Sequence, residues 1–314
     1  MIQQVSIEEA YLRIKPYIHH SPVLTSQTLN DRSGAHLYFK CENFQKIGAF
    51  KIRGAMNAAL SLTESERVHG LATHSSGNHA QAIAYAARTL GIPAYIVMPE
   101  NSPKPKIEAV KGYGAKVTLC EPNQKAREET IAEIVRATGA AFVHPYDDER
   151  VIAGQATCAL EMIRDGYPLE AIITPVGGGG LLSGTALAVR YFLPNGITYA
   201  GEPEGAADAY ASLTTGILQS ASYIDTIADG LLTRISERTF SIIQDHVSEI
   251  FTVSDEEIIQ SLRLIYERMK IVVEPSCVVP LAAVLKHRSV FEGKHIGIIL
   301  TGGNIDLKKL AEWL

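Results

Sequence analysis

The chain has 314 residues, 46% of them hydrophobic, and a net charge of −5 at pH 7. Its apolar residues suffice for one large core or two moderate cores, and its acidic balance without a basic block argues against nucleic acid or an anionic membrane as the main partner. Residues 1–9 lack the basic-then-apolar pattern of a secretory signal, and no uncharged apolar stretch is long enough to span a bilayer, so we expect a cytoplasmic protein.

Strand-like and helix-like segments alternate along the whole chain. Short apolar runs predict strands at 36–41, 70–74, 94–98, 116–119, 171–176, 198–201 and 295–300. Apolar residues at helical spacing predict helices at 8–18, 79–90, 124–137, 152–163, 181–192, 256–269 and 280–286. This alternation is typical of α/β folds, and the length predicts two open, twisted parallel sheets flanked by helices. Small-residue loops at 75–78, 177–180 and 301–304 each follow a predicted strand, so we expect one shared site there.

Four consecutive glycines separate the predicted strand at 171–176 from the predicted helix at 181–192. A glycine backbone can approach a ligand closely, and the amino end of a helix favours an anion, so this turn predicts a phosphate site. The turn lacks the Lys-Ser/Thr ending of a P-loop and the GxGxxG spacing of dinucleotide folds, which favours a cofactor that is anchored and not hydrolysed. A flexible linker is the alternative, but its flanks would be polar. The residues are Gly177, Gly178, Gly179 and Gly180.

Lys51 lies in the segment GAFKIRGA (48–55), at the predicted start of a helix. Partial desolvation beside an aromatic and small residues would lower the pKa of its amine and favour a nucleophile. Lys40 and Lys46 are nearby alternatives, and most lysines are solvated surface charges. A phosphate cradle together with a lysine that can form a Schiff base is typical of pyridoxal 5'-phosphate (PLP).

With these motifs, the chain resembles the fold type II pyridoxal-phosphate enzymes, in the serine/threonine dehydratase and serine racemase branch. The resemblance covers nearly the whole chain, through FKCENFQK (39–46), FKIRGA (50–55), THSSGNH (73–79), the glycine run and MKIVVEPS (269–276). It implies a large PLP-binding domain of residues 1–52 and 147–314, a small domain of residues 53–146, and an active site between them. Members of the family commonly form homodimers.

Carried over to this sequence, the resemblance implies a covalent bond between Lys51 and the cofactor. Phe50 would lie against the pyridine ring, and Asn78 would donate to or accept from the ring oxygen. Thr301 would face the pyridine nitrogen, where close relatives more often have Ser. A neutral hydroxyl there cannot keep the nitrogen protonated, which favours elimination at Cβ over transamination. The phosphate would be held by Gly177, Gly178, Gly179, Gly180 and Leu181.

The loop at 75–78 is expected to open a helix whose amide groups receive the substrate carboxylate. Ser76 matches the serine that racemases of this branch place on the ring face opposite the lysine, so it is a candidate second catalytic residue beside Lys51. The alternative is that Ser76 only caps the helix and binds the carboxylate. The substrate-binding residues implied are Ser75, Ser76, Gly77, Asn78 and His79.

Glu202, Ala206 and Asp208 match the divalent cation site of the family, which uses two carboxylates and one backbone carbonyl. Oxygen ligands of this kind suit Mg²⁺ or Ca²⁺, completed by water. Without the resemblance, the two acids would be interpreted as ordinary solvated side chains.

We therefore expect a PLP-dependent ammonia-lyase that converts L-serine or L-threonine to a 2-oxo acid and ammonia by β-elimination. The alternatives are a serine racemase with dehydratase side activity and a threo-3-hydroxyaspartate ammonia-lyase, because the loop HPYDD (144–148) borders the substrate side chain in the family. A non-catalytic ligand-binding relative is a further alternative, against which Lys51 and the intact glycine run argue. The expected partner is a small β-hydroxy amino acid, and the branch leaves open a nucleotide effector.

Overall fold

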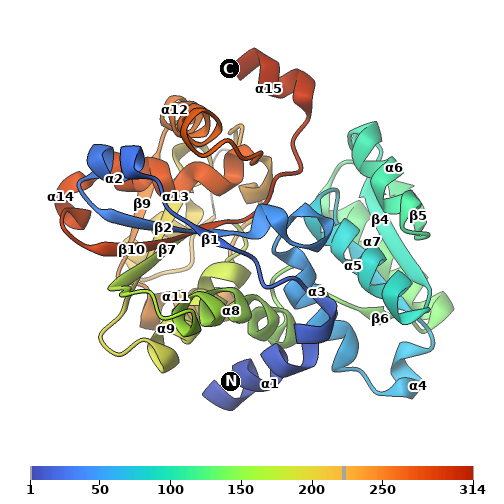
Figure 1. The fold of residues 1–314 in the computed structure, drawn as a ribbon. Helices are drawn as coiled ribbons and strands as arrows, with labels where there is room; N and C mark the ends of the chain where they lie inside the picture. Colours follow the sequence, from blue (N-terminus) through green and yellow to red (C-terminus); the bar gives the residue numbers. More distant parts are fainter. Residues whose placement is uncertain (1, 221–223, 314) are drawn as a thin grey trace.

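Two sheets organise the chain (Figure 1), which a computed structural model describes over residues 2–220 and 224–313. The larger sheet has the strand order β1-β2-β10-β7-β8-β9, and the smaller sheet has the order β5-β4-β3-β6. Neighbouring strands are parallel, except that β1 pairs with β2 in the antiparallel direction. The α/β class with two parallel sheets flanked by helices is thus confirmed.

The strands include all seven that the sequence predicts, with bounds shifted by at most two residues. Two of the other three, β1 and β6, have only two residues each, and the third, β9, mixes polar and apolar residues, so none has a clear pattern. The large sheet contains β1 (Val23–Leu24), β2 (His36–Cys41), β7 (Ala171–Pro175), β8 (Ile197–Pro203), β9 (Glu249–Val253) and β10 (His295–Leu300). The small sheet contains β3 (Leu71–His74), β4 (Ala94–Pro99), β5 (Lys116–Cys120) and β6 (Ala141–Phe142).

Prolines account for two of the larger differences between predicted and observed helices; in a third, the helix predicted at 256–269 ends at Leu264 and continues as a π-helix at Ile265–Met269. The helix predicted at 8–18 lies at Gln4–Ile14 and continues as a short 3₁₀-helix at Lys15–Tyr17, because Pro16 has no N–H to extend the α-helical hydrogen bonds. The helix predicted from residue 280 begins at Pro275, since a proline in the first turn lacks only an N–H that would have no helical partner. The α-helices are α1 (Gln4–Ile14), α2 (Gln27–Ser33), α3 (Lys51–Leu60), α4 (Glu64–Arg67), α5 (Asn78–Leu90), α6 (Lys104–Gly112), α7 (Gln124–Thr138), α8 (Glu149–Arg164), α9 (Gly180–Phe192), α10 (Asp208–Thr215), α11 (Glu237–His246), α12 (Asp255–Leu264), α13 (Pro275–Lys286), α14 (Arg288–Phe291) and α15 (Leu307–Trp313).

The large sheet is buried on both faces, as expected for parallel strands. Alternate residues of β7 point to opposite sides, so Ile172 packs with α8 and α9 while Ile173 packs with α12 and α13. The small sheet is covered by α3 and α5 on one face and by α7 on the other. In Figure 1, α3 lies between the two sheets, and it packs against both α5 and α8. It therefore links the two parts of the molecule.

The division into domains at residues 52/53 and 146/147 stays a prediction. Residues 1, 221–223 and 314, which it assigns to the large domain, lie outside the described residues. Over the described part of the chain, no helix is both long enough and apolar enough to cross a membrane.

Candidate active site

The loops at the carboxyl ends of β3, β6, β7 and β10 surround a cavity of about 370 Å³. Ligands of open α/β sheets collect at this edge, and the volume suits a small cofactor with its substrate. Every residue predicted to contact PLP or substrate lines the cavity, although the segments lie far apart in sequence. They are Phe50, Lys51, Ser75, Ser76, Gly77, Asn78, His79, Gly177, Gly178, Gly179, Gly180, Leu181 and Thr301.

Lys51 is the first residue of α3 and is half-buried. The backbone N–H of Phe50 donates to Thr301 O at 3.0 Å, which joins the start of α3 to the end of β10. The amine of Lys51 donates to Pro145 O at 3.0 Å and has no carboxylate partner among the described residues. Burial lowers the pKa of Lys51 to about 8, partly opposed by the charge of Glu274. A larger fraction of this amine than of an ordinary lysine amine is therefore neutral and nucleophilic near neutral pH.

The four glycines leave no room for side chains. A Cβ on Gly178 would lie 2.3 Å from the Tyr146 ring, and one on Gly180 would lie 2.9 Å from Tyr146 Cβ. Gly179 has φ of 83°, a value that L-residues rarely adopt, and it forms the N-cap of α9. The helix thus begins at the cavity with bare backbone, an arrangement that suits a phosphate.

The loop after β3 provides hydroxyl and backbone groups at the start of α5. Ser75 Oγ accepts the backbone N–H of Gly77 at 3.3 Å, whereas the hydroxyl of Ser76 has no protein partner in the described chain. His79 is buried, and its Nε2 lies 3.2 Å from Val143 O. Burial, with the charge of Lys51, holds the pKa of His79 well below its usual value. The His79 ring is thus a neutral group that joins α5 to the loop after β6.

Glu274 is a cavity residue to which the sequence analysis assigns no role. It accepts a hydrogen bond from Asn78 Nδ2 at 2.9 Å and has no Lys or Arg ion pair among the described residues. Burial, with the nearby charge of Asp229, raises the pKa of Glu274 to about 7. The sequence signal was a single acid within the apolar run IVVEPSCVV (271–279).

Several side chains with nitrogen groups line the cavity, among them Arg127, His144 and His74. Arg127 lines it and forms no ion pair in the described part of the chain, and its Nε is buried without a hydrogen-bond partner. His144 Nδ1 accepts the backbone N–H of Asp147 at 2.8 Å, and burial lowers the pKa of His144, so its neutral ring carries the hydrogen on Nε2. Burial also lowers the pKa of His74 to about 4. Nothing in the sequence separated Arg127 from the other charges of its predicted helix, so this basic lining was missed.

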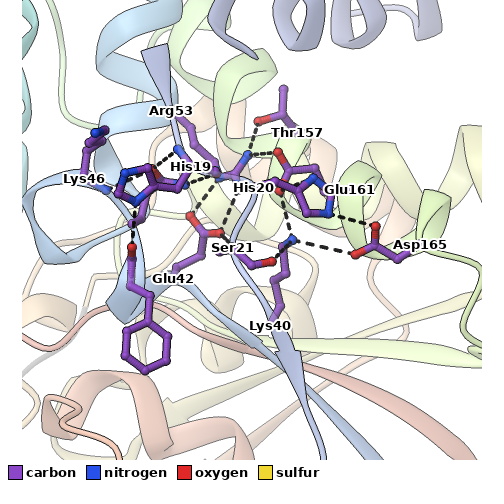
Figure 2. Close-up of polar contacts among 12 residues, drawn as sticks. His19, His20, Ser21, Lys40, Glu42, Lys46, Arg53, Thr157, Glu161 and Asp165 are labelled. Carbon is purple, nitrogen blue, oxygen red and sulfur yellow. Dashed lines mark hydrogen bonds and ion pairs between the residues drawn. The ribbon is translucent and has the colours of Figure 1, made fainter. Parts of the chain in front are cut away.

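A buried ionic cluster holds the first turn of α3 in place (Figure 2). The Arg53 guanidinium donates to both Glu42 oxygens at 2.7 and 2.8 Å and to both Glu161 oxygens at 2.9 and 2.7 Å. Lys40 Nζ lies 2.9 Å from Glu161 and donates to Ser21 O at 2.8 Å. Two cations and two anions balance, as burial requires. Because Arg53 lies two positions after Lys51, the cluster also fixes the position of the helix start that carries the Lys51 amine.

The predicted cation ligands lie outside the cavity, at the end of β8 and the start of α10. Glu202 is buried and accepts the backbone N–H groups of Ala209 and Tyr210 at 3.0 and 2.7 Å, and Asp208 accepts that of Ile235 at 3.0 Å. Neither carboxylate has a Lys or Arg ion pair within the described chain. Groups of three or more His, Cys, Asp or Glu side chains that could hold a metal do not occur in the described residues, so a cation here would also need carbonyl and water ligands.

Comparisons with known proteins agree with the geometry of the cavity. A model of the family described as pyridoxal-phosphate dependent enzyme matches residues 14–302. A beta-hydroxyaspartate dehydratase from Paracoccus denitrificans (strain Pd 1222) is 49% identical over 301 residues, which cover 96% of this chain and 96% of that protein. The structure of serine racemase from Dictyostelium discoideum has a TM-score of 0.93 at 46% identity and covers 97% of this chain and 99% of that one. The structure of a threonine deaminase from T.th. has a TM-score of 0.92 at 42% identity, with the same coverage of 97% and 99%.

The matched residues include Lys51, the loop at 75–78 and the glycine run, and the predicted family resemblance is confirmed. The residues around the cavity suit the cofactor in the family's name, because they combine an amine of lowered pKa with a glycine turn at the start of α9 that suits a phosphate. The chain belongs to the pyridoxal-phosphate dependent enzymes.

Proposed function

We propose that the protein is an ammonia-lyase that acts by β-elimination on a β-hydroxy amino acid, for which L-serine and L-threonine are the first candidates. One observation carries this proposal: the Lys51 amine, whose pKa is lowered, lies in the same cavity as the glycine cradle. Bound there, PLP would supply an electron sink for the electrons left at Cα when its proton departs.

The roles of the protein groups follow from their positions. The glycine run and the start of α9 would hold the phosphate of PLP, and the start of α5 would bind the α-carboxylate of the substrate. Lys51 would hold the cofactor and, once displaced by the substrate amine, take the Cα proton. The β-hydroxyl would leave with a proton as water, which balances the proton taken from Cα, and the released enamine would be hydrolysed to a 2-oxo acid and ammonia.

Replacing the lysine tests this proposal. Lys51→Ala should lose both the absorbance of covalently held PLP and the release of 2-oxo acid from serine or threonine. Lys46→Ala, which removes a neighbouring lysine outside the cavity, is the matched control and should keep both. A Lys51→Ala protein that retained the absorbance and the activity would contradict the proposal.

A second candidate substrate is 3-hydroxyaspartate, which carries one more carboxylate than serine. The unpaired Arg127 in the cavity lining favours it, because a guanidinium without an anionic partner suits a substrate carboxylate. The relative from Paracoccus denitrificans is named a beta-hydroxyaspartate dehydratase, which supports this candidate.

Racemisation is a further candidate activity, supported by the free hydroxyl of Ser76 in the cavity that also contains Lys51. A second group that exchanges the Cα proton is what racemisation requires. If Ser76→Ala loses D-serine formation but keeps 2-oxo acid release, Ser76 serves racemisation. Equal loss of both activities would instead indicate binding of the carboxylate.

We also propose that Glu202, Asp208 and the carbonyl of Ala206 bind Mg²⁺ or Ca²⁺. The buried pair of carboxylates without a basic partner supports a divalent cation there. Because these residues lie away from the cavity, we expect the cation to stabilise the fold around β8 and α10 and not to contact the substrate.

A further inference from the structure

The side-chain amide of Asn78 is held from two sides by residues distant in sequence. Its Oδ1 accepts a hydrogen bond from Asn304 Nδ2 at 2.8 Å, and its Nδ2 donates to Glu274 Oε1 at 2.9 Å. An amide nitrogen has two N–H donors. One N–H of the Asn78 side chain therefore has no protein partner among the described residues, and Asn78 lines the cavity.

The backbone carbonyl of Ile47 sets the orientation of Asn304, and through it the direction of the hydrogen bonds from Asn304 to Asn78 and from Asn78 to Glu274. Asn304 Nδ2 also donates to Ile47 O at 2.8 Å. Because a carbonyl can only accept, Asn304 must turn its nitrogen toward Ile47, and the same nitrogen reaches Asn78. Ile47 has φ of 60°, a region in which β-branched residues are rare, and such strain concentrates at functional sites. The strained turn lies just before Lys51 in the chain.

The carboxyl group of Glu274 accepts the last hydrogen bond of this series, from Asn78 Nδ2. The backbone N–H of Glu274 donates to Gly302 O at 3.0 Å, and a Cβ on Gly302 would lie 2.8 Å from Glu274 Oε1, so the carboxyl is packed closely against this loop. Above its pKa of about 7, the Glu274 carboxylate is ionised, so it accepts the N–H of Asn78 and would repel the Asn78 oxygen. If the Asn78 amide were reversed, its oxygen would face the accepting carboxylate of Glu274. Its nitrogen would then face the donating nitrogen of Asn304.

We infer that Glu274 and Asn304 are positioning residues that keep Asn78 in one orientation, so that it presents an N–H group, and not its oxygen, to the cavity. The inference rests on the proposed function and on the family resemblance, which implies that Asn78 hydrogen-bonds the ring oxygen of PLP. A donor at that position favours the ionised form of the oxygen, whereas a reversed amide would favour the protonated form.

The absorbance spectrum of the holoenzyme tests the inference, because bound PLP absorbs in different bands when its ring oxygen is ionised and when it is protonated. Glu274→Gln keeps the shape of the side chain but adds a donor that accommodates a reversed Asn78. Asn304→Asp removes the donor at the opposite end. We expect both variants to shift the ratio of the two bands toward the protonated form, by roughly 2- to 10-fold, which corresponds to one net hydrogen bond. Circular dichroism confirms that each variant is folded.

Glu267→Gln is the matched control, because it removes a charge from an exposed glutamate between α12 and α13, and it should keep the wild-type ratio. Absence of any band of bound PLP in the wild-type protein would overturn the proposed function itself. Wild-type bands with an unchanged ratio in both variants would overturn only the positioning role. A shift in one variant alone would also contradict it, because the two residues would then not act through one chain.

Discussion

Burial changes the chemistry of single residues in this protein. In the cavity, Lys51 has a pKa lowered to about 8 and Glu274 a pKa raised to about 7, so both groups can exchange protons near neutral pH. Arg127 forms no ion pair in the described chain, and its buried Nε has no hydrogen-bond partner. We propose that these three residues govern, respectively, how PLP is held, how its ring is contacted and which substrate binds.

The lowered pKa of Lys51 predicts the pH dependence of cofactor attachment. Only the neutral amine attacks the PLP aldehyde, so the attachment rate of cofactor-free protein should rise with pH, reach half its maximum at about pH 8 and level off above it. Stopped-flow absorbance measures this rate. An amine with the ordinary pKa of 10.5 would instead give a rate that still rises well beyond pH 9.

Arg127 should determine the choice between substrates. Arg127→Met should lower kcat/KM for 3-hydroxyaspartate by roughly 10- to 100-fold, as expected for a lost charge-assisted hydrogen bond of about 1.5–3 kcal/mol, and should change kcat/KM for serine little. Steady-state assays with both substrates measure the ratio. Arg136→Met removes an exposed arginine of the same helix and should leave the ratio unchanged. Equal losses for both substrates would exclude a role for Arg127 in selectivity.

At the scale of secondary-structure elements, the start of a helix is the recurring functional unit. Helix α9 begins at the glycine cradle, α5 begins at Asn78 and α3 begins at Lys51. Each helix start is fixed by contacts from elsewhere in the chain: Tyr146 packs against the cradle, Glu274 holds Asn78, and the ionic cluster holds Arg53. Each helix sets the direction of its first backbone N–H groups, and contacts from distant segments fix the position of those groups.

The ionic cluster predicts an ordered series of stability losses. Arg53→Met leaves two buried carboxylates without their shared partner and should lower the free energy of unfolding by about 3–5 kcal/mol. Lys40→Met should cost less, because Glu161 keeps both of its hydrogen bonds to Arg53. Urea unfolding of the cofactor-free proteins measures both without a contribution from PLP binding. Equal losses would show that Arg53 is not the centre of the cluster.

At the scale of the whole molecule, the cavity needs both sheets. The small sheet contributes Ser75, Ser76 and Asn78, and the large sheet contributes the glycine run and Thr301. Lys106, in α6 beside the small sheet, donates to Asp229 at 2.5 Å, and both residues line the cavity. This contact joins the two parts of the molecule at the site, so their relative position decides the shape of the cavity.

The proposed cation site should appear as a stability effect of the whole protein. Mg²⁺ at a hundredfold excess over its Kd should stabilise the wild-type fold by about 2.7 kcal/mol and raise its Tm, because it binds only the folded chain. Asp208→Asn should lose the response to Mg²⁺ in a thermal melt. Glu204→Gln, a neighbouring exposed carboxylate that pairs with Lys286, should keep it. A wild-type protein without any response would contradict the site.

The amino-acid sequence by itself determined the α/β class, all seven predicted strands and the predicted residues that line the cavity, because periodicity, glycine runs and contiguous motifs are local signals. Only the tertiary structure revealed the groups that hold and complete the site. Asn78 and Glu274 are 196 positions apart, and Asn78 and Asn304 are 226 apart, so no local pattern pairs them. Arg127 likewise looks like any other charge of a polar helix until the fold buries its Nε beside the cavity. The physical reason is that desolvation and hydrogen-bond geometry, which set the chemistry of these groups, arise only when distant segments pack together.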